Sequence, residues 1–236
     1  MKTFYSDNFL SVQPKISKLY KKHSSRLIRE LYAVTEKHAD MASLRRRLKL
    51  KICPSIPLEE MASHPMTLKL LELFVLAKKP KKILEIGSYI GLSAMNMARN
   101  LPPGGKIVTV EKYTEIAEIA RSNFKANRFS DKITLITGDV FQQWDVVKKQ
   151  SPFDVIFIDG GMEQLADHWL QMDAVLAKGG IIAIDDIFYY GDALNASPST
   201  KKGIGARKLI GKTQHLKNYR KIILPIANGI MILVKR

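Results

Sequence analysis

The fold is decided by residues 82–93, which read KILEIGSYIGLS. Residues 82–86 form a short apolar run typical of a buried strand, and a helical pattern begins at Leu92. Gly87 and Gly91 lie between them, where glycine lets the backbone turn sharply and approach a ligand. The free amides at the start of the helix favour an anion. The spacing is E-x-G-x-x-x-G, not the G-x-G-x-x-G of dinucleotide enzymes, so a pyrophosphate is not expected.

Strands and helices alternate after this stretch. We expect strands at 106–111, 132–137, 153–159 and 180–184, and helices at 92–100, 116–126 and 165–176. Such a succession of βα units predicts an α/β protein with a doubly wound parallel sheet and helices on both faces.

The regions on either side of the βα units differ from them. A helix is expected at 65–77, before the first strand. Strands at 219–224 and 230–234 are separated by five residues, too few for a crossover helix, so an antiparallel hairpin is expected. Residues 189–211 are expected to form a loop or insertion followed by a short basic helix.

Acidic residues end two of the predicted strands. Glu111 follows Gly91 by 20 residues, where a carboxylate accepts hydrogen bonds from ribose hydroxyls in a nucleotide-binding βαβ unit. Asp139 ends the third strand, at the same edge of the sheet. Alone, the glycine motif is also consistent with a plain strand-to-helix turn, but three strands with polar or glycine ends favour a binding site.

The order of βα units, the glycine motif, the acidic end of the second strand and the terminal hairpin resemble the S-adenosylmethionine-dependent methyltransferases. The segments LEIGSYIGLSA, IVTVEKYTEIAEIAR, DVIFIDGG, GGIIAIDD and LPIANGIMILVKR are similar to those of the cation-dependent O-methyltransferases. That family includes catechol and caffeoyl-CoA O-methyltransferases and bacterial relatives that modify tRNA hydroxyuridine. The resemblance covers residues 58–236 and implies a Rossmann-like, seven-stranded, mostly parallel sheet. Residues 1–57 match no motif and are expected to be a helical extension that serves as a cap or in dimerisation.

The resemblance also implies functional residues. It assigns binding of S-adenosyl-L-methionine to Met61, Ser63, Glu85, Gly87, Tyr89, Gly91, Ser93, Glu111, Lys112, Asp139, Val140 and Asp159. Among these, Ser93 would bind the carboxylate of the cofactor and Glu111 its ribose. For Met61 without the family, ordinary core packing is the alternative.

A second set of residues is acidic. Asp159 ends one predicted strand, and Asp185 and Asp186 end its neighbour. Three carboxylates at one edge repel each other unless a cation neutralises them, and oxygen ligands suit Mg²⁺, with Mn²⁺ or Ca²⁺ as alternatives. The family has Asn where this chain has Asp186. The alternative is that one aspartate binds substrate or cofactor and the others are solvated.

One position departs from the family. Catechol-type enzymes have a lysine as general base three residues after the first metal aspartate, and here that residue is Met162, which cannot accept a proton. Either another residue is the base, or metal coordination acidifies the acceptor hydroxyl. The candidates are Glu163, His168, Lys201 and Lys202, and Lys201 is assigned as catalytic together with Asp159. Met162 is alternatively part of an apolar substrate pocket.

The formal net charge of +16 on 236 residues is concentrated at the two ends. Residues 1–60 carry 13 Lys or Arg and 6 Asp or Glu, residues 61–200 carry 15 and 16, and residues 201–236 carry 10 and none. This asymmetry favours an anionic partner, such as RNA, an acidic carrier protein or an anionic metabolite. Tyr189 and Tyr190, close to the basic helix, suit an aromatic anion or an RNA base. A merely solvated cationic surface is the alternative.

The remaining composition narrows the class of protein. Cys53, the single cysteine, excludes an internal disulfide framework and fits a reducing compartment. No apolar run is long enough for a membrane helix, and the N-terminal residues lack the apolar core of a secretory signal. A cytoplasmic globular protein, forming a homodimer by family resemblance and having no membrane partner, is expected.

The sequence therefore predicts methyl transfer from S-adenosylmethionine to a phenolic or enolic hydroxyl of a small acceptor, assisted by a divalent cation. Two alternatives stay open. One is a tRNA or rRNA methyltransferase, and the other is a cofactor-binding protein without catalysis.

Overall fold

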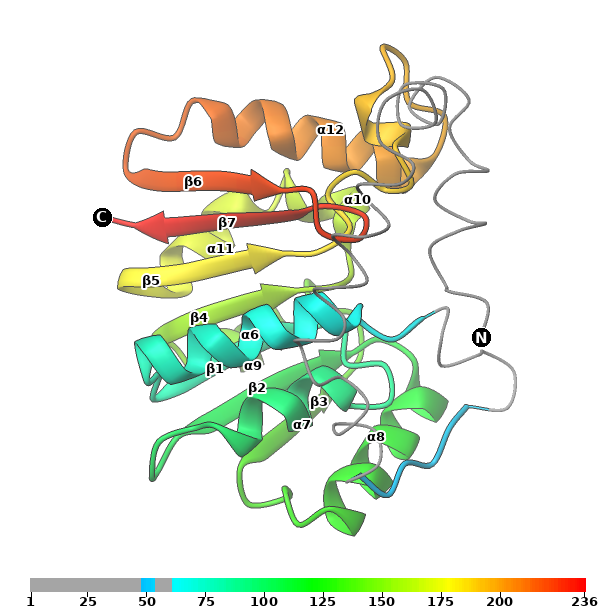
Figure 1. Cartoon of the computed structure of the whole chain (residues 1–236), viewed down its shortest axis with the longest axis vertical. Helices are drawn as coiled ribbons and strands as arrows, with labels where there is room; N and C mark the ends of the chain where they lie inside the picture. The colour runs from blue at the N-terminus through cyan, green and yellow to red at the C-terminus, as the bar shows by residue number, and fades with distance from the viewer. Residues whose placement is uncertain (1–47, 54–60) are drawn as a thin grey trace, which may run out of the picture.

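The computed structural model describes residues 48–53 and 61–236. A seven-stranded sheet with the order β3-β2-β1-β4-β5-β7-β6 forms its centre (Figure 1). The strands are β1 (Lys82–Ile86), β2 (Lys106–Glu111), β3 (Ile133–Thr137), β4 (Phe153–Ile158), β5 (Leu176–Ile184), β6 (Tyr219–Leu224) and β7 (Ile230–Lys235). Strands β1 to β5 pair in parallel, whereas β7 is antiparallel to both β5 and β6. The predicted mostly parallel sheet and C-terminal hairpin are confirmed.

Helices cover both faces of the sheet. They are α6 (Pro65–Lys78), α7 (Leu92–Arg99), α8 (Thr114–Ala126), α9 (Trp144–Lys148), α10 (Met162–Leu165), α11 (Trp169–Val175), the 3₁₀ helix η1 (Asp192–Leu194) and α12 (Lys201–Gln214). One core cluster joins the sheet to α6, α7 and α8, and a second joins its other face to α9, α10, α11 and α12. Because side chains alternate along a strand, neighbours such as Ile83 and Leu84 contribute to opposite clusters.

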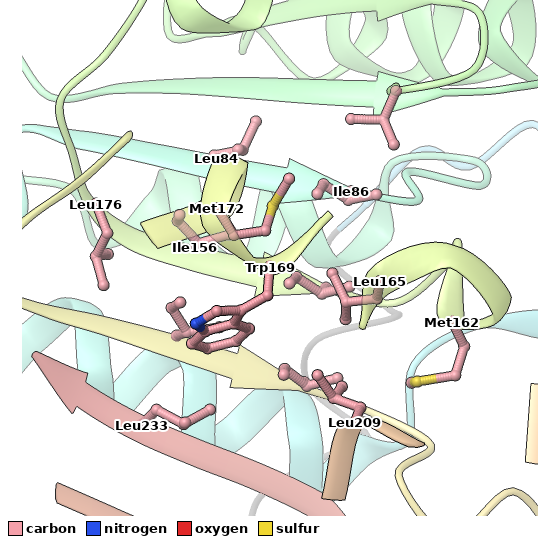
Figure 2. Close-up of a cluster of buried hydrophobic side chains, with 14 of the residues drawn as sticks. Leu84, Ile86, Ile156, Met162, Leu165, Trp169, Met172, Leu176, Leu209 and Leu233 are labelled. Carbon is pink, nitrogen blue, oxygen red and sulfur yellow. The ribbon is translucent and has the colours of Figure 1, made fainter. Parts of the chain in front are cut away.

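The second cluster positions the elements that follow β4. Figure 2 shows Trp169 and Met172 of α11 beside Leu84 and Ile156 of the sheet, and all four are buried. Burying large apolar side chains contributes about 1.5–3 kcal/mol each. The loops at the carboxyl ends of β4 and β5 are therefore connected to well-packed elements.

The region between β4 and β5 differs from the prediction. A single helix at 165–176 was expected, but α10 and α11 are separate short helices, and His168 is the N-cap of α11. Strand β5 begins at Leu176, which pairs with Phe153, rather than at Gly180. The pairing shifts between Phe153 and Val155, and this irregularity lets residues of low strand propensity join the strand.

Two further helices depart from expectation. The short helix α9 was not predicted, because five residues give too little periodicity to recognise. The basic helix α12 is 14 residues long and not short. The Thr200 side chain caps it by accepting a hydrogen bond from the Gly203 amide, at 3.0 Å.

The predicted N-terminal extension, residues 1–57, lies outside the described residues except for 48–53. In that segment the Lys49 and Lys51 amides donate to the side chains of Asn127 and Asn123, at 2.9 and 2.6 Å. The two asparagines return hydrogen bonds to the same residues' carbonyls, so the segment is attached to α8 and the residue after it. Within the described ranges, no helix is both long and apolar enough to span a membrane.

Candidate functional site

The candidate site lies at the carboxyl ends of β1, β4 and β5. The pairing of Ile86 with Ile158, and of Ile158 with Ile184, brings the three strand ends level with each other. A Cβ at Gly87 would lie 2.6 Å from the Asp159 carbonyl oxygen, and Gly87 has a φ of +91°. Only glycine fits this approach, which places the glycine turn against the first residue after β4. Sequence reasoning had proposed Gly87 for ligand contact, and the structure adds this packing role.

The turn ends at Gly91, the N-cap of α7, which has a φ of +86°. A Cβ there would lie 2.2 Å from the Phe124 ring of α8, so the start of α7 is packed tightly against α8. Within the described residues, the buried hydroxyl of Ser88 in this turn has no hydrogen-bond partner. A buried polar group without a partner is unfavourable unless a ligand or water completes it.

Glu85 is fully buried at the end of β1, and burial raises its pKa to about 7. Hydrogen bonds from the Ser93 and Thr109 side chains oppose this shift, and the Thr109 hydroxyl donates to Oε2 at 2.5 Å. Oε1 makes no hydrogen bond that meets ordinary distance and angle limits with the described residues. Glu85 therefore has acceptor capacity left at the base of the glycine turn.

Glu111 ends β2 and is almost completely buried. Its Oε2 accepts from the Tyr89 amide at 2.8 Å, and its Oε1 accepts from the Tyr113 amide at 3.0 Å. Tyr89 has a left-handed φ of +47°, so this hydrogen bond holds a residue in a conformation that non-glycine residues rarely adopt. Each carboxylate oxygen has a further lone pair for a ligand donor.

The next two predicted cofactor residues lie beside Glu111. The Lys112 ammonium pairs with Asp139 at 3.2 Å, and Asp139 also accepts from the Phe141 amide at 3.0 Å. The pKa of Asp139 lies below its usual value, because the hydrogen bonds from Lys112 and Phe141 outweigh the opposing effect of burial. Val140, which lies between Asp139 and Phe141 in the sequence, is buried. Lys112, Asp139 and Val140 therefore lie next to Glu111 at the carboxyl ends of β2 and β3.

The three predicted metal ligands follow β4 and β5. Burial, and then repulsion from Asp185 and Asp186, raise the pKa of Asp159 well above its ordinary value. Burial and Asp186 raise the pKa of Asp185 to about 7, and burial also raises the pKa of Asp186. The three carboxylates therefore interact electrostatically, as the prediction of a shared acidic site required.

Other side chains contact this acidic group. The Ser63 hydroxyl donates to Asp159 Oδ2 at 2.7 Å, so the segment before α6 lies against the end of β4. A hydrogen bond from the Asn228 side chain and the charge of Lys202 oppose the pKa shift of Asp186. In the part of the chain that the structure describes, no three His, Cys, Asp or Glu side chains are arranged to hold a metal ion. The structure therefore brings the three aspartates together without forming a metal site.

The remaining predicted residues occupy different surroundings. Met61 is 48% exposed, so core packing does not explain it. Met162, in contrast, is buried in the second core cluster (Figure 2). Glu163 is exposed, and His168 stacks on the Phe141 ring at 3.8 Å. Lys201 is exposed at the first position of α12.

Sequence reasoning missed the role of Asp192, which organises the loop after β5. Its carboxylate accepts hydrogen bonds from the amides and hydroxyls of Ser199 and Thr200 and from the Asn195 side chain. These hydrogen bonds, first that of the Ser199 amide, hold the pKa of Asp192 well below its usual range. The signal was an aspartate followed within eight residues by Asn, Ser and Thr, which favour such turns.

The chain is similar in sequence to known O-methyltransferases. The family model described as O-methyltransferase matches residues 31–236, so the match begins upstream of residue 58. The catechol O-methyltransferase of Mycobacterium tuberculosis is 28% identical over 142 residues, covering 60% of this chain and 64% of that protein. The caffeoyl-CoA O-methyltransferase of Stellaria longipes is 27% identical over 145 residues, covering 60% of each. The chain thus matches a little under two thirds of each relative's length.

Solved structures show the same fold. An O-methyltransferase from Bacillus cereus in complex with SAH has a TM-score of 0.71 and 21% identity, covering 96% of this chain and all of that one. An O-methyltransferase from Streptomyces achromogenes in complex with SAM has a TM-score of 0.71 and 20% identity, covering 84% of this chain and 88% of that one.

Proposed function

Because the chain belongs to the O-methyltransferase family of S-adenosylmethionine-dependent enzymes, we propose that it methylates a phenolic or enolic hydroxyl of a small anionic acceptor. The observation that carries the proposal is the contact between the glycine turn after β1 and Asp159, one of the three clustered aspartates. Gly87 packs on the backbone of Asp159, whose carboxylate belongs to that group. Cofactor and acceptor would then meet at the ends of β1 and β4.

The residues around the turn fit S-adenosylmethionine. The buried Ser88 hydroxyl and Glu85 Oε1 have unused hydrogen-bonding capacity, and Glu111 has lone pairs that suit ribose hydroxyls. When bound, the cofactor supplies an electrophilic methyl group. The chain's own contribution is to position the acceptor oxygen against that group and to exclude water. We assign cofactor binding to the twelve residues named from the sequence, with Glu85 and Glu111 as the principal contacts.

The ligand type of the three aspartates fits a divalent cation, although their side chains are not arranged around one in the structure. Asp159, Asp185 and Asp186 offer only hard oxygen ligands, and their raised pKa values reflect repulsion that a cation would relieve. Mg²⁺ is our first choice, with Mn²⁺ or Ca²⁺ as alternatives. Such a cation would help to stabilise the acceptor as an oxyanion, which replaces part of the role of the lysine absent at Met162.

Titration calorimetry with S-adenosylmethionine tests the first step, and transfer of a labelled methyl group to catechols tests the second. We expect micromolar binding, and a Glu111→Ala variant should bind at least tenfold more weakly. Failure of the wild-type chain to bind the cofactor would refute the proposal. Excess chelator should abolish transfer and Mg²⁺ should restore it, whereas unchanged turnover in chelator would remove the cation from the mechanism.

Two other functions have some support. The ten basic and no acidic residues of 201–236 favour RNA as the acceptor, and RNA binding that weakens steeply with salt would support that function. Met162 in place of a base favours a protein that binds the cofactor without catalysis, which predicts binding but no transfer to phenols or bulk tRNA.

A homodimer and a cytoplasmic location stay predictions, and sedimentation of the full chain tests the first.

A further inference from the structure

Residues 48–53, which we call the strap, lie against the glycine turn and the start of α7. Leu50 is partly buried and packs against a cluster that includes Leu92, the first residue of α7. Cys53 is buried in a further cluster, which also contains Tyr89 of the turn. The strap therefore packs on residues within the turn and directly after it, although it precedes both by more than 30 positions.

Asn123 of α8 joins the strap to the turn. Its Oδ1 accepts from the Lys51 amide at 2.6 Å, and its Nδ2 donates to the Lys51 carbonyl at 3.0 Å and to the Ile90 carbonyl at 2.9 Å. The amide group of asparagine carries two N–H donors, so both donated hydrogen bonds can form together. Asn123 and Ile90 are both buried, so loss of the Asn123 amide would leave the Ile90 carbonyl buried without this donor.

Asn127, four residues after Asn123, contacts the strap in the same way. Its Oδ1 accepts from the Lys49 amide and its Nδ2 donates to the Lys49 carbonyl, both at 2.9 Å. Its other donated hydrogen bond goes to the Asn123 carbonyl of α8 at 2.8 Å, and not to the glycine turn. The two asparagines thus pair with alternate residues of the strap, and they differ in the contact that Asn123 makes with Ile90.

The Ile90 carbonyl belongs to the part of the turn that leads into α7. Ile90 lies between Tyr89, whose amide donates to Glu111, and Gly91, the N-cap of α7. The turn is therefore held from β2 through Glu111 and from α8 through Asn123. The free amides at the start of α7, which favour an anionic group of a ligand, depend on both attachments for their position.

We propose that Asn123 is a positioning residue for the cofactor, which holds the glycine turn in its binding conformation and couples it to the strap. The inference rests on the proposed methyl transfer from S-adenosylmethionine and adds to it a coupling between two segments of the chain. Coupling between two equilibria is reciprocal. A strap attached through Asn123 therefore strengthens cofactor binding, and bound cofactor slows the local opening of the strap.

The first test is titration calorimetry of the full chain with S-adenosylhomocysteine. Asn123→Asp keeps the size of the side chain and the acceptor for the Lys51 amide, but it removes the donors. We expect about a tenfold higher Kd, because the Ile90 carbonyl loses its donor. Asn127→Asp is the matched control, since it places the same charge on the same segment and breaks the same kind of strap contact. Its Kd should change less than about twofold, because Asn127 does not donate to the turn.

A second pair of variants changes the strap and leaves α8 intact. Lys51→Pro removes the amide that donates to Asn123, at an exposed position, and should raise the Kd about threefold. Lys49→Pro removes the corresponding donor to Asn127 and is its control, with a change of less than about twofold expected.

Amide hydrogen exchange of the strap gives a readout that a merely structural role would not change. In the wild type and in Asn127→Asp, saturating S-adenosylhomocysteine should slow exchange of the Lys51 amide at least about threefold. In Asn123→Asp, the same degree of saturation should leave this exchange unchanged, because the strap is no longer coupled to the turn.

Three outcomes would overturn the proposal. They are equal changes of Kd in Asn123→Asp and Asn127→Asp, exchange of the Lys51 amide that does not respond to S-adenosylhomocysteine in the wild type, and an equal response in both variants. If Asn123→Asp shows no cooperative unfolding transition, Lys51→Pro and Lys49→Pro decide, and equal Kd values for these two refute the coupling. Failure of the wild type to bind S-adenosylhomocysteine refutes instead the proposed methyltransferase function, so the two failures are distinguishable.

Discussion

The carboxylates at the two halves of the sheet edge, the ends of β1 and β2 and the ends of β4 and β5, differ in their hydrogen bonds and in the charges around them. At the ends of β1 and β2, Glu111 accepts two backbone hydrogen bonds and Glu85 accepts a threonine hydroxyl. At the ends of β4 and β5, Asp159 and Asp185 lie beside each other and Asp186, and repulsion adds to burial in raising the pKa values of the first two. In the first half the protein supplies hydrogen-bond donors to both carboxylates and leaves Glu85 Oε1 unused, whereas the second half has an excess of negative charge.

This difference indicates what each half binds. A carboxylate fixed by amide donors recognises neutral hydroxyl groups through its remaining lone pairs, which suits a ribose. A cluster of repelling carboxylates is stabilised by a positive charge, whether a metal ion or a lysine such as Lys202. Substitutions in the two halves should therefore separate stability from catalysis.

The largest effect is expected in the first half, for Gly91→Ala. The added Cβ would lie 2.2 Å from the buried Phe124 ring, at a backbone φ of +86°. We expect a loss of about 3 kcal/mol in the free energy of unfolding, measured by urea denaturation. Gly104→Ala is the control, because Gly104 has a φ of +78° but no atom within 4 Å, so about 1 kcal/mol is expected. Equal losses would show that packing against α8 does not define the turn.

In the second half, Asp185→Asn should separate activity from stability. Asparagine retains an oxygen to accept the Asp186 amide, which donates to Asp185 at 3.0 Å, but it removes one crowded charge. We expect about a hundredfold lower kcat/KM for methyl transfer together with a higher melting temperature at pH 8 without added metal. The exposed Asp131→Asn is the matched control. A variant that is both less active and less stable would contradict the view that this carboxylate is crowded.

A smaller effect concerns the pH dependence of Glu85. Its pKa rises from 4.5 to about 7 on folding, so between these values the folded chain holds a proton that the unfolded chain has lost. The stabilisation is complete below pH 4.5 and is lost as the pH rises through 7. Glu85→Gln does not titrate, so its stability relative to the wild type should be about 2 kcal/mol more favourable at pH 8 than at pH 5.

Urea denaturation at the two pH values measures this difference. Glu115→Gln, an exposed position in α8, is the control and should show no such change. A difference that is the same at both pH values would mean that Glu85 is ionised throughout, and the two halves of the edge would then differ more than the structure indicates.

Most of the fold could be predicted from the sequence because it depends on local patterns. The apolar run at 82–86, the glycines after it and the five-residue connection between β6 and β7 each permit few structures. The division into α10 and α11 could not be predicted. It depends on how Trp169 and Met172 pack in the core and on the early pairing of Leu176 with Phe153, which are tertiary contacts.

For the site, the sequence likewise predicted the residues at strand ends but not the contacts between distant side chains. Glu111, Asp159 and Asp185 were proposed because strand ends meet at one edge of a parallel sheet, whereas Glu85 was proposed from the family resemblance. The contact of Lys202 with the Tyr189 ring could not be predicted, since it depends on the direction that the side chain takes from the first turn of α12. The hydrogen bond from Ser63 to Asp159 joins residues 96 positions apart, and no local pattern indicates it.

The hydrogen bonds of Asp192 have a consequence for protein engineering. The described partners of its carboxylate are Asn195, Ser199 and Thr200, so the segment from η1 to the start of α12 is closed on itself. Substitution of Asn195, Ser199 or Thr200 would remove part of this network, whereas exchange of residues 191–203 for a segment with equivalent residues would keep it. The acceptor range of this chain should therefore be altered by grafting the whole segment from a relative, with the sheet left unchanged.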